Sequence, residues 1–458
     1  MSEPVPMKAS SALQYSIAKP ASRKAIYFSL LLIFMPAVTL YAVCFRFLCN
    51  IPVFDDYDAV LDFLNKFSNL PSNSSRFAFV LFEQHNEYKP IFANAIVALQ
   101  YRISGHANFV LLSILGDLQV LAIAWIFWWC FLPRNVDLAS RLTLFVPVSF
   151  IIFQLNYNET LNWPMPCLQN IGVVAFALIA LYAATRTGHA AFATACAGLA
   201  LSIAASGNGF ALFPVGMLLF WQERKVWRAA VWTLVTIACG VIYFYRYNFA
   251  SSQQGGGTLH TATHHLNLIY TLSFLGASVG IQRPYIRYLS IVLGIVICVA
   301  VVLAVRRRFY RVNPAVSYYA LFLLLTGLGV SGIRSGLGYD QSLSSRYKIY
   351  SDLLLVCCYA FALHEVARSS VVRVRRFYKV AVLASGFFFL AGTALGIYQM
   401  HRRYVGLWEG MALYKSSRGT QGPMLAPPGP DHDINILHDE DFRPILERAE
   451  KNNIYHVP

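Results

Sequence analysis

Charged residues are scarce in this chain. Of its 458 residues, 13% are Asp, Glu, Lys or Arg and 57% are hydrophobic, which gives a mean hydropathy of +0.50. A soluble domain is about one quarter charged, so this deficit excludes an ordinary soluble enzyme and predicts a membrane protein. The nine cysteines have neither metal-binding spacing nor the pattern of a disulfide framework. We interpret them as packing residues inside apolar segments.

Apolar runs long enough to cross a bilayer recur along the whole sequence. They predict an all-α polytopic membrane protein with eleven or twelve hydrophobic segments. The run 266–281 contains Gly276 and Gly280 and is expected to be short or re-entrant. The first run follows three basic residues and has no small-residue cleavage site, so we expect it to stay attached as a signal anchor. The predicted spans are 26–48, 109–132, 142–156, 167–184, 190–206, 209–221, 229–245, 288–305, 315–333, 349–364 and 379–398.

The distribution of basic residues predicts the orientation of the chain. The short loops QERKVWR, RRRFYR and VARSSVVRVRRFYK all fall on one side when the N-terminus is cytoplasmic, as the positive-inside rule requires. The inner segments then carry an excess of bases equal to the full net charge of +15. This excess reports topology, and nucleic-acid binding is not expected. The sequence therefore predicts a multi-pass protein of the inner (plasma) membrane.

The same orientation divides the chain into three parts. Residues 1–25 form a cytoplasmic tail, 26–398 form the multi-span membrane domain, and 399–458 form a periplasmic or extracellular tail. The membrane domain includes a large outer loop at 49–108. Its length and its acidic residues make this loop the first place to look for chemistry.

The outer loop opens with FDDYDAVLDFLNKF. Apolar residues recur at helical spacing from Val60 to Phe67, which predicts an amphipathic helix suited to the membrane surface. Asp55 and Asp56 come just before its first turn. One interpretation is that these carboxylates cap the helix and favour the positive end of its dipole. The other is that one of them is a general base at the mouth of a membrane-embedded cavity.

A second polar cluster, EQHNE, lies later in the same loop. Its residues Glu83, His85 and Glu87 are either part of a solvated loop or ligands for a substrate. They are also the candidate ligands for a divalent cation, although their spacing is not diagnostic of a metal site. The sequence does not determine a cofactor.

Outer-facing cations and hydrogen-bonding groups follow in later loops. Arginine suits phosphate because its planar fork makes paired hydrogen bonds, but a lone arginine beside a tyrosine is also a common interfacial anchor. The turn LNYNETLNWPMP adds amides and a carboxylate, as a sugar pocket or an ordinary polar turn requires. The candidate substrate-binding residues are Glu83, His85, Glu87, Glu159, Arg283, Arg346, Tyr347 and Lys348.

This arrangement resembles the GT-C superfamily of integral-membrane glycosyltransferases. The matching features are FDDYD after the first span, the amphipathic stretch AVLDFLNKF and the second acidic group in EQHNE. The resemblance implies a polyprenyl-phosphate sugar donor and a periplasmic glycan or protein acceptor, such as a pilin. It implies Asp55 as the catalytic base, with Asp56 as the second choice, and Glu83 and His85 as acceptor or metal ligands.

Two other functions remain open at this point. A lipid-linked glycan polymerase or ligase shares the donor chemistry, but such enzymes usually rely on outer Arg and His. A transporter or flippase is expected to place ionisable residues deep in the membrane and often contains a repeat. Only Asp117 lies deep within a predicted span, and no repeat is visible. We therefore expect a membrane glycosyltransferase.

Overall fold

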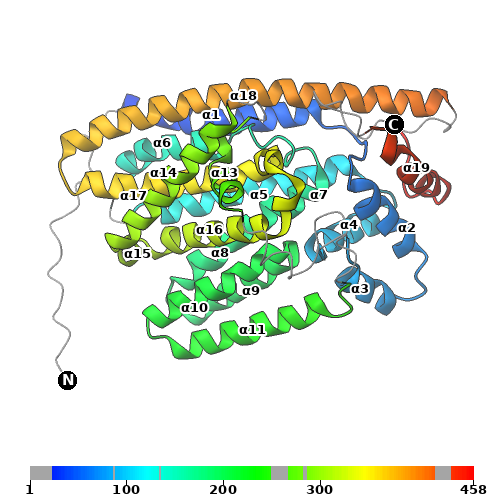
Figure 1. The fold of residues 1–458 in the computed structure, drawn as a ribbon, viewed down its shortest axis with the longest axis horizontal. Helices are drawn as coiled ribbons and strands as arrows, with labels where there is room; N and C mark the ends of the chain where they lie inside the picture. Colours follow the sequence, from blue (N-terminus) through cyan, green and yellow to red (C-terminus); the bar gives the residue numbers. More distant parts are fainter. Residues whose placement is uncertain (1–22, 86–87, 134–135, 249–266, 282–285, 418–434) are drawn as a thin grey trace.

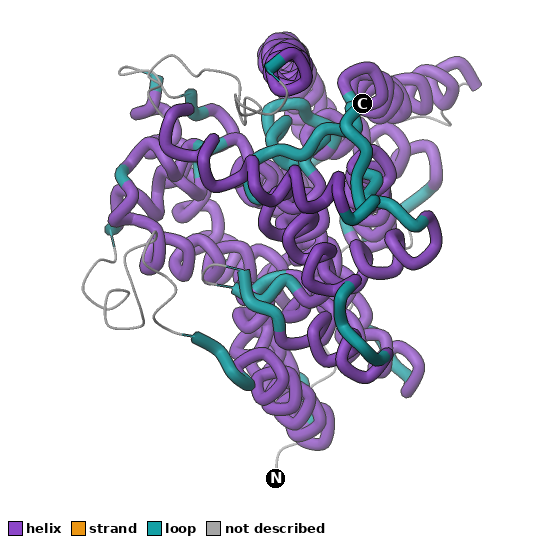
Figure 2. Tube along the Cα trace, turned by 90° about the vertical axis from the view of Figure 1, so that its right-hand side faces the viewer, coloured by secondary structure: helices purple, strands orange, loops and turns teal. Residues whose placement is uncertain are grey.

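The protein is an all-helical polytopic membrane protein. The computed structural model describes residues 23–85, 88–133, 136–248, 267–281, 286–417 and 435–458. Figure 2 shows helices and loops in these ranges and no strand. Eight helices are long and apolar enough to span a bilayer, which confirms the predicted fold class. They are α1 (Arg23–Phe47), α5 (Phe109–Cys130), Pro164–Ala184 ending in α8 (Gly172–Ala184), α11 (Val226–Phe244), α14 (Arg287–Arg306), α16 (Pro314–Arg334), Ser345–Ala367 containing α17 (Lys348–Ala367), and α18 (Val371–Ser416).

The other predicted spans are also helices, but shorter ones. These are α6 (Leu138–Ile152), α9 (His189–Ala205) and α10 (Leu212–Gln222). A rise of 1.5 Å per residue gives α10 a length of roughly 16 Å, well short of a hydrocarbon core of about 30 Å. The glycine-containing run becomes the short helix α13 (Leu268–Leu275), as its sequence predicted.

The helix α18 contains 46 residues and dominates one side of the molecule (Figure 1). Its length is roughly 69 Å, more than twice the hydrocarbon thickness, so it extends far beyond the bilayer. The predicted outer tail at 399–458 therefore begins inside this helix and not at its end. The added turns carry α18 to the end of the molecule where the first outer loop lies (Figure 1).

The outer loop folds with the C-terminus into a compact layer. It contains η1 (Tyr57–Asp62), α2 (Phe63–Ser68), α3 (Asn73–Phe82) and α4 (Ile91–Ser104), and it packs against α19 (Asn435–Lys451). The apolar side of FDDYDAVLDFLNKF is covered by this protein layer and not by lipid. In contrast, α3 has no buried residue and leaves Phe77 67% exposed, so α3 is the helix of this loop suited to the membrane surface.

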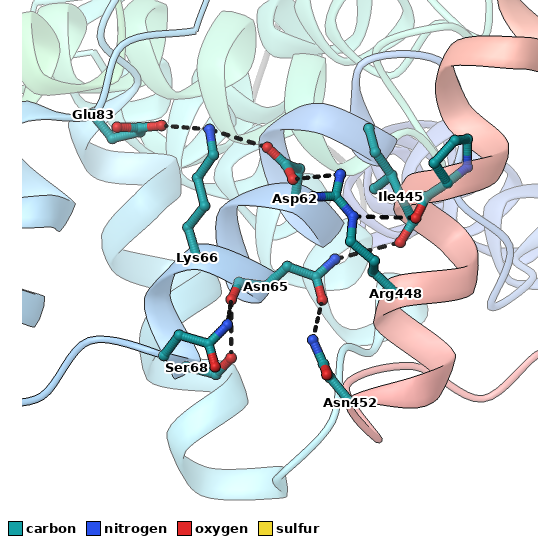
Figure 3. Close-up of polar contacts among 10 residues, drawn as sticks. Asp62, Asn65, Lys66, Ser68, Glu83, Ile445, Arg448 and Asn452 are labelled. Atoms are coloured by element: carbon teal, nitrogen blue, oxygen red, sulfur yellow. Dashed lines mark hydrogen bonds and ion pairs between the residues drawn. The ribbon is translucent and has the colours of Figure 1, made fainter.

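Polar contacts join α19 to η1 and α2 (Figure 3). The Asn65 Nδ2 donates to the Ile445 carbonyl at 3.3 Å, and the Asn452 Nδ2 donates to the Asn65 Oδ1 at 3.0 Å. The Arg448 guanidinium reaches the Asp62 carboxylate at 3.4 Å. Because Asn65 is only 4% exposed, its hydrogen bonds are the ones that fix how α19 docks.

Two glycines allow α13 and α14 to cross at close range. A Cβ at Gly294 would lie 2.0 Å from the Leu272 carbonyl oxygen, and one at Gly276 would lie 1.9 Å from the Ser290 carbonyl oxygen. Small residues at such crossings let helix backbones approach each other in membranes. The short α13 is thereby held against α14 and stays part of the bundle.

This crossing predicts a specific sensitivity to one methyl group. Gly294→Ala should lower the free energy of unfolding by about 1–3 kcal/mol, because Leu272 must move to accommodate the methyl group. The measurement is the unfolding temperature of the protein purified in detergent. The matched control is Gly386→Ala in α18, where nothing lies within 4 Å of the added Cβ. Equal stability of the two variants would contradict the close crossing.

Candidate functional site

Several of the predicted site residues interact electrostatically at the end of the bundle where the loop 49–108 lies. The side chain of Tyr88 interacts electrostatically with Asp55, Arg346 and Tyr347. Arg346 in turn interacts with Glu159 and Asp55. These groups come from the first outer loop, from the turn before Pro164–Ala184, and from the turn before α17. The structure therefore brings together residues that are separated by up to about 290 positions in the sequence.

The neighbouring aspartates have different environments. Asp56 is fully buried; its Oδ2 accepts from the Val53 N–H at 3.1 Å and its Oδ1 from the Met165 N–H at 3.3 Å. Burial raises the pKa of Asp56 well above its ordinary value. The carboxylate of Asp55 is half-buried and accepts no hydrogen bond from the described residues. Asp56 therefore ties the loop to the membrane domain, and Asp55 is the aspartate that is available for chemistry.

Neither aspartate caps the helix that follows. Asp56 occupies the position before η1, but its side chain makes no capping hydrogen bond and instead accepts from residues outside the helix. Asp55 contributes through its backbone, because its carbonyl accepts from the Ala59 N–H at 2.7 Å. The predicted side-chain cap is therefore absent, and the favourable interaction with the helix dipole stays a prediction.

The turn that carries Arg346 is held by Glu159. The Glu159 Oε2 accepts from the Ser344 hydroxyl at 2.8 Å and from the Arg346 N–H at 3.2 Å. The Glu159 N–H donates to the Ser345 Oγ at 3.0 Å, and the Thr160 hydroxyl donates to the Arg346 carbonyl at 3.3 Å. All four hydrogen bonds join the turn that contains Glu159 to the turn that contains Arg346. The Glu159 carboxylate is therefore occupied in holding the Arg346 turn and is not available to bind a substrate.

Arg346 presents a cation to the site. Its side chain is half-buried and lies 5.5 Å from the Tyr347 ring centroid, measured from Cζ. Its Nε is buried without a hydrogen-bond partner among the described residues. A guanidinium has five donors in a fixed plane, and such a group suits a phosphate. The turn is held by Glu159 through backbone and hydroxyl groups, which leaves the guanidinium available.

Tyr88 is a member of the site that the sequence did not predict. Burial, together with the nearby Asp55 carboxylate, raises the pKa of Tyr88 well above its ordinary value. Its hydroxyl therefore stays protonated at neutral pH and can donate a hydrogen bond. The tyrosine follows the polar cluster EQHNE directly, but one tyrosine in an outer loop carries no signal of function by itself.

The polar loop around Tyr88 is fixed to the end of α11. The Gln84 side chain donates to the Asn248 carbonyl at 3.0 Å and accepts from the Asn248 N–H at 2.8 Å. The Lys89 N–H donates to the Tyr243 hydroxyl at 3.1 Å, and its ammonium donates to the Tyr245 carbonyl. These contacts hold the outer loop over the membrane domain.

Arg403 also supports the site and was not predicted. Its guanidinium donates to the Asn158 carbonyl and to the Asn158 Oδ1, both at 3.2 Å, and interacts electrostatically with Glu159. It lies on α18 beyond the end of the predicted span, in a region that the sequence analysis assigned to the outer tail. Arg403 could have been identified if the helix of the predicted span 379–398 had been expected to continue past residue 398.

The remaining predicted residues have other environments. Lys348 is 4% exposed and interacts electrostatically with Asp352 and Glu159. It is therefore a buried neighbour of the site and not an exposed substrate-binding residue. Glu83 forms a 3.1 Å ion pair with Lys66, which also contacts Asp62 at 3.0 Å. His85 interacts electrostatically with Asp55 and Glu83. Glu87 and Arg283 lie outside the described residues.

The described part of the chain offers no three-residue cluster of His, Cys, Asp or Glu for a metal ion. The candidate set of Glu83, His85 and Glu87 includes a residue outside those ranges, so it stays a prediction. No known protein-family model, curated protein or solved structure matches this chain. The geometry of the site is therefore the basis for assigning a function.

The different environments of the two aspartates predict different effects on stability. Asp56→Ala removes the acceptor of two buried N–H groups, at a cost of about 1–3 kcal/mol each. Asp55→Ala is the matched control and should change stability by less than about 0.5 kcal/mol, because no hydrogen bond is lost. Unfolding temperatures in detergent measure both. A large loss for Asp55→Ala would contradict this assignment of roles.

His85 predicts a pH dependence. Burial lowers the pKa of His85 below its ordinary value of about 6.5. The folded protein therefore resists protonation that the unfolded chain accepts, and stability falls as the pH decreases from about 6.5 through the folded-state pKa. His85→Gln should remove that part of the loss, as measured by unfolding temperatures between pH 5 and 7.5. The exposed His401→Gln should keep the wild-type dependence; identical behaviour of the two variants would refute the effect.

Proposed function

We propose that this protein is a membrane glycosyltransferase that transfers a sugar from a polyprenyl-phosphate donor to a periplasmic glycan or protein acceptor. The observation that carries the proposal is that Asp55, Tyr88 and Arg346 lie near enough to interact electrostatically at one end of the bundle. A carboxylate without hydrogen-bond donors and a guanidinium without a bound acceptor, among the described residues, are the two groups that this reaction needs. The alternatives are a lipid-linked glycan polymerase or ligase and a transporter.

In the proposed reaction, Asp55 accepts the proton of an acceptor hydroxyl as its oxygen attacks the anomeric carbon. The bond between that carbon and the phosphate oxygen breaks, and its electron pair leaves with the polyprenyl phosphate. Arg346 stabilises the negative charge that grows on the departing phosphate. Tyr88, held protonated, donates a hydrogen bond to an oxygen of the donor or the acceptor. The products are the glycosylated acceptor, a polyprenyl phosphate and a protonated Asp55.

The surroundings of these groups support a carbohydrate substrate. Tyr243 and Tyr347 interact electrostatically with Tyr88, and Tyr270 interacts with Arg346. The Tyr270 hydroxyl donates to the Gln341 side chain at 3.1 Å. Tyrosines offer apolar ring faces beside polar hydroxyls, which suits a ligand with both hydroxyl groups and C–H surfaces.

A transporter is favoured by one observation, the presence of buried carboxylates in the membrane domain. Asp117 and Asp352 are 3% and 1% exposed, and such residues often mark transport pathways. Each is partnered by a neighbour, because Cys167 donates to Asp117 at 3.1 Å and Asn156 donates to Asp352 at 3.3 Å. These contacts give Asp117 and one oxygen of Asp352 a structural partner, whereas the Asp352 Oδ2 is buried without one among the described residues. The outer site, in which Asp55, Tyr88 and Arg346 interact electrostatically, is the stronger basis for a function.

The proposal predicts which residues turnover requires. Membranes containing the protein are incubated with a panel of labelled polyprenyl-phosphate sugars and with periplasmic glycan and protein acceptors. Wild type should transfer label, and Asp55→Asn should reduce transfer by about 100-fold or more, as loss of a general base does. Arg346→Gln should lower the rate by a similar factor through lost stabilisation of the leaving phosphate.

The matched controls are Asp58→Asn and Arg287→Gln. Each removes the same charge as the variant that it controls; Asp58 is exposed and Arg287 is half-buried. Full activity of Asp55→Asn at equal expression would overturn the site. Turnover of lipid-linked oligosaccharides only would favour the ligase, and absence of turnover with every donor would favour transport.

A further inference from the structure

A cavity lies at the end of the bundle opposite the candidate site. Its volume is about 190 Å³, and its walls come from the ends of α5 and α8, the start of α16 and the middle of α17. Residues that line it include Trp129, Pro133, Arg186 and Asn313. Typical small-molecule sites are about 300–1,000 Å³, so this cavity suits a small group and not a nucleotide sugar.

One cation in the wall of this cavity, Arg186, has no hydrogen-bonded acceptor among the residues that the structure describes. The Arg186 Cζ lies 4.4 Å from the Tyr182 ring centroid, so the side chain is held by the ring. Its Nε is buried and has no hydrogen-bond partner in the described ranges. A guanidinium on an aromatic ring keeps its N–H donors available at its edge for a planar or tetrahedral anion.

Two neighbouring arginines behave differently, which makes Arg186 distinct. The Arg141 guanidinium donates to the Trp128 and Pro133 carbonyls at 2.8 and 2.7 Å. The Arg228 guanidinium donates to the Arg186 carbonyl at 3.0 Å and to the Ala184 carbonyl at 3.4 Å. Both are buried and satisfy the carbonyl ends of helices. They add positive charge around the cavity, whereas the guanidinium of Arg186 is left for a ligand.

The charge of the lining agrees with an anionic ligand. No acidic residue is among the described residues that line the cavity. The Asn313 amide is uncharged, and its groups are used within the protein: its Nδ2 donates to the Cys130 carbonyl at 2.7 Å and its Oδ1 accepts from the Val316 N–H at 3.3 Å. Basic pockets between membrane helices on the cytoplasmic side are sites where anionic lipid headgroups bind.

From these observations we propose that the cavity binds a phosphate group at Arg186, supplied by the headgroup of an anionic lipid. The position fits this source, because the cavity lies where membrane helices end and the headgroup layer begins. The phosphate replaces the missing acceptor of the guanidinium, and the surrounding apolar side chains contact the glycerol and the first carbons. This site is independent of the outer site and of the reaction proposed for it.

The test uses the full chain, purified in detergent and delipidated. Phosphatidylglycerol is then added, and native mass spectrometry measures the fraction of protein that binds it. Thermal unfolding measures stabilisation of the protein by inorganic phosphate. At a lipid concentration where wild type binds one phosphatidylglycerol, the fraction of Arg186→Gln that carries a lipid should be about tenfold lower. The reason is the loss of a charge-assisted hydrogen bond to the phosphate. Arg186→Lys should recover part of the binding.

The matched control is Arg311→Gln, an exposed arginine at the same end that does not line the cavity. It should retain lipid like wild type. Equal losses for Arg186→Gln and Arg311→Gln would show that general positive charge attracts the lipid, which overturns the cavity site. Stabilisation by inorganic phosphate that disappears only in Arg186→Gln, without lipid retention, would support the phosphate site and assign it to a soluble ligand. Absence of both effects in wild type would overturn the proposal.

Discussion

The arrangement of the outer site depends on the hydrogen bonds that Glu159 accepts. Its carboxylate binds the Ser344 hydroxyl and the Arg346 N–H, and its own N–H binds Ser345. Because these contacts involve the backbone of the Arg346 turn, they position the guanidinium without neutralising it by a direct ion pair. A carboxylate that bound the guanidinium itself would compete with a phosphate. The structure separates the supporting acid from the available acid, Asp55.

Residues of α18 also hold the turn that contains Glu159. Arg403 fixes Asn158, the neighbour of Glu159, by two hydrogen bonds, and the Gln399 side chain accepts from the same asparagine. These residues can reach the site only because α18 continues beyond the bilayer. The chain then returns as α19 to pack on η1 and α2, the two elements that follow Asp55 in the sequence (Figure 3). The C-terminal part of the sequence thus supports both the cationic and the acidic side of the site.

Much of the fold could be predicted from the sequence, because apolar length and periodicity directly reflect the requirements of a bilayer. Each predicted span corresponds to a helix, and Gly276 correctly indicated the break after α13. The end of α18 could not be predicted, since a helix that leaves the bilayer loses its apolar signal and continues as a polar helix. The docking of α19 on Asn65 depends on contacts between residues about 380 positions apart, which a single sequence does not encode visibly.

The site could be predicted in part. Asp55 and Arg346 were identified because their residue types suit the chemistry, and the structure places them in one electrostatic cluster. The different environments of Asp55 and Asp56 could not be predicted from the sequence, because they depend on the N–H groups of Val53 and Met165, which donate to Asp56. Adjacent identical residues have equal propensities, and only the tertiary structure decides which one is buried.

The arginines of this protein meet the same physical problem in two different ways. Inside a bilayer, a buried arginine must find acceptors, and Arg141 and Arg228 find them in the carbonyl ends of helices. Arg346 and Arg186 lack such acceptors among the described residues; Arg346 lies in the turn before α17, and Arg186 lines the cavity at the other end of the bundle. An incompletely satisfied guanidinium is costly unless a ligand completes it. That cost is the physical reason to expect an anion at both ends of this molecule.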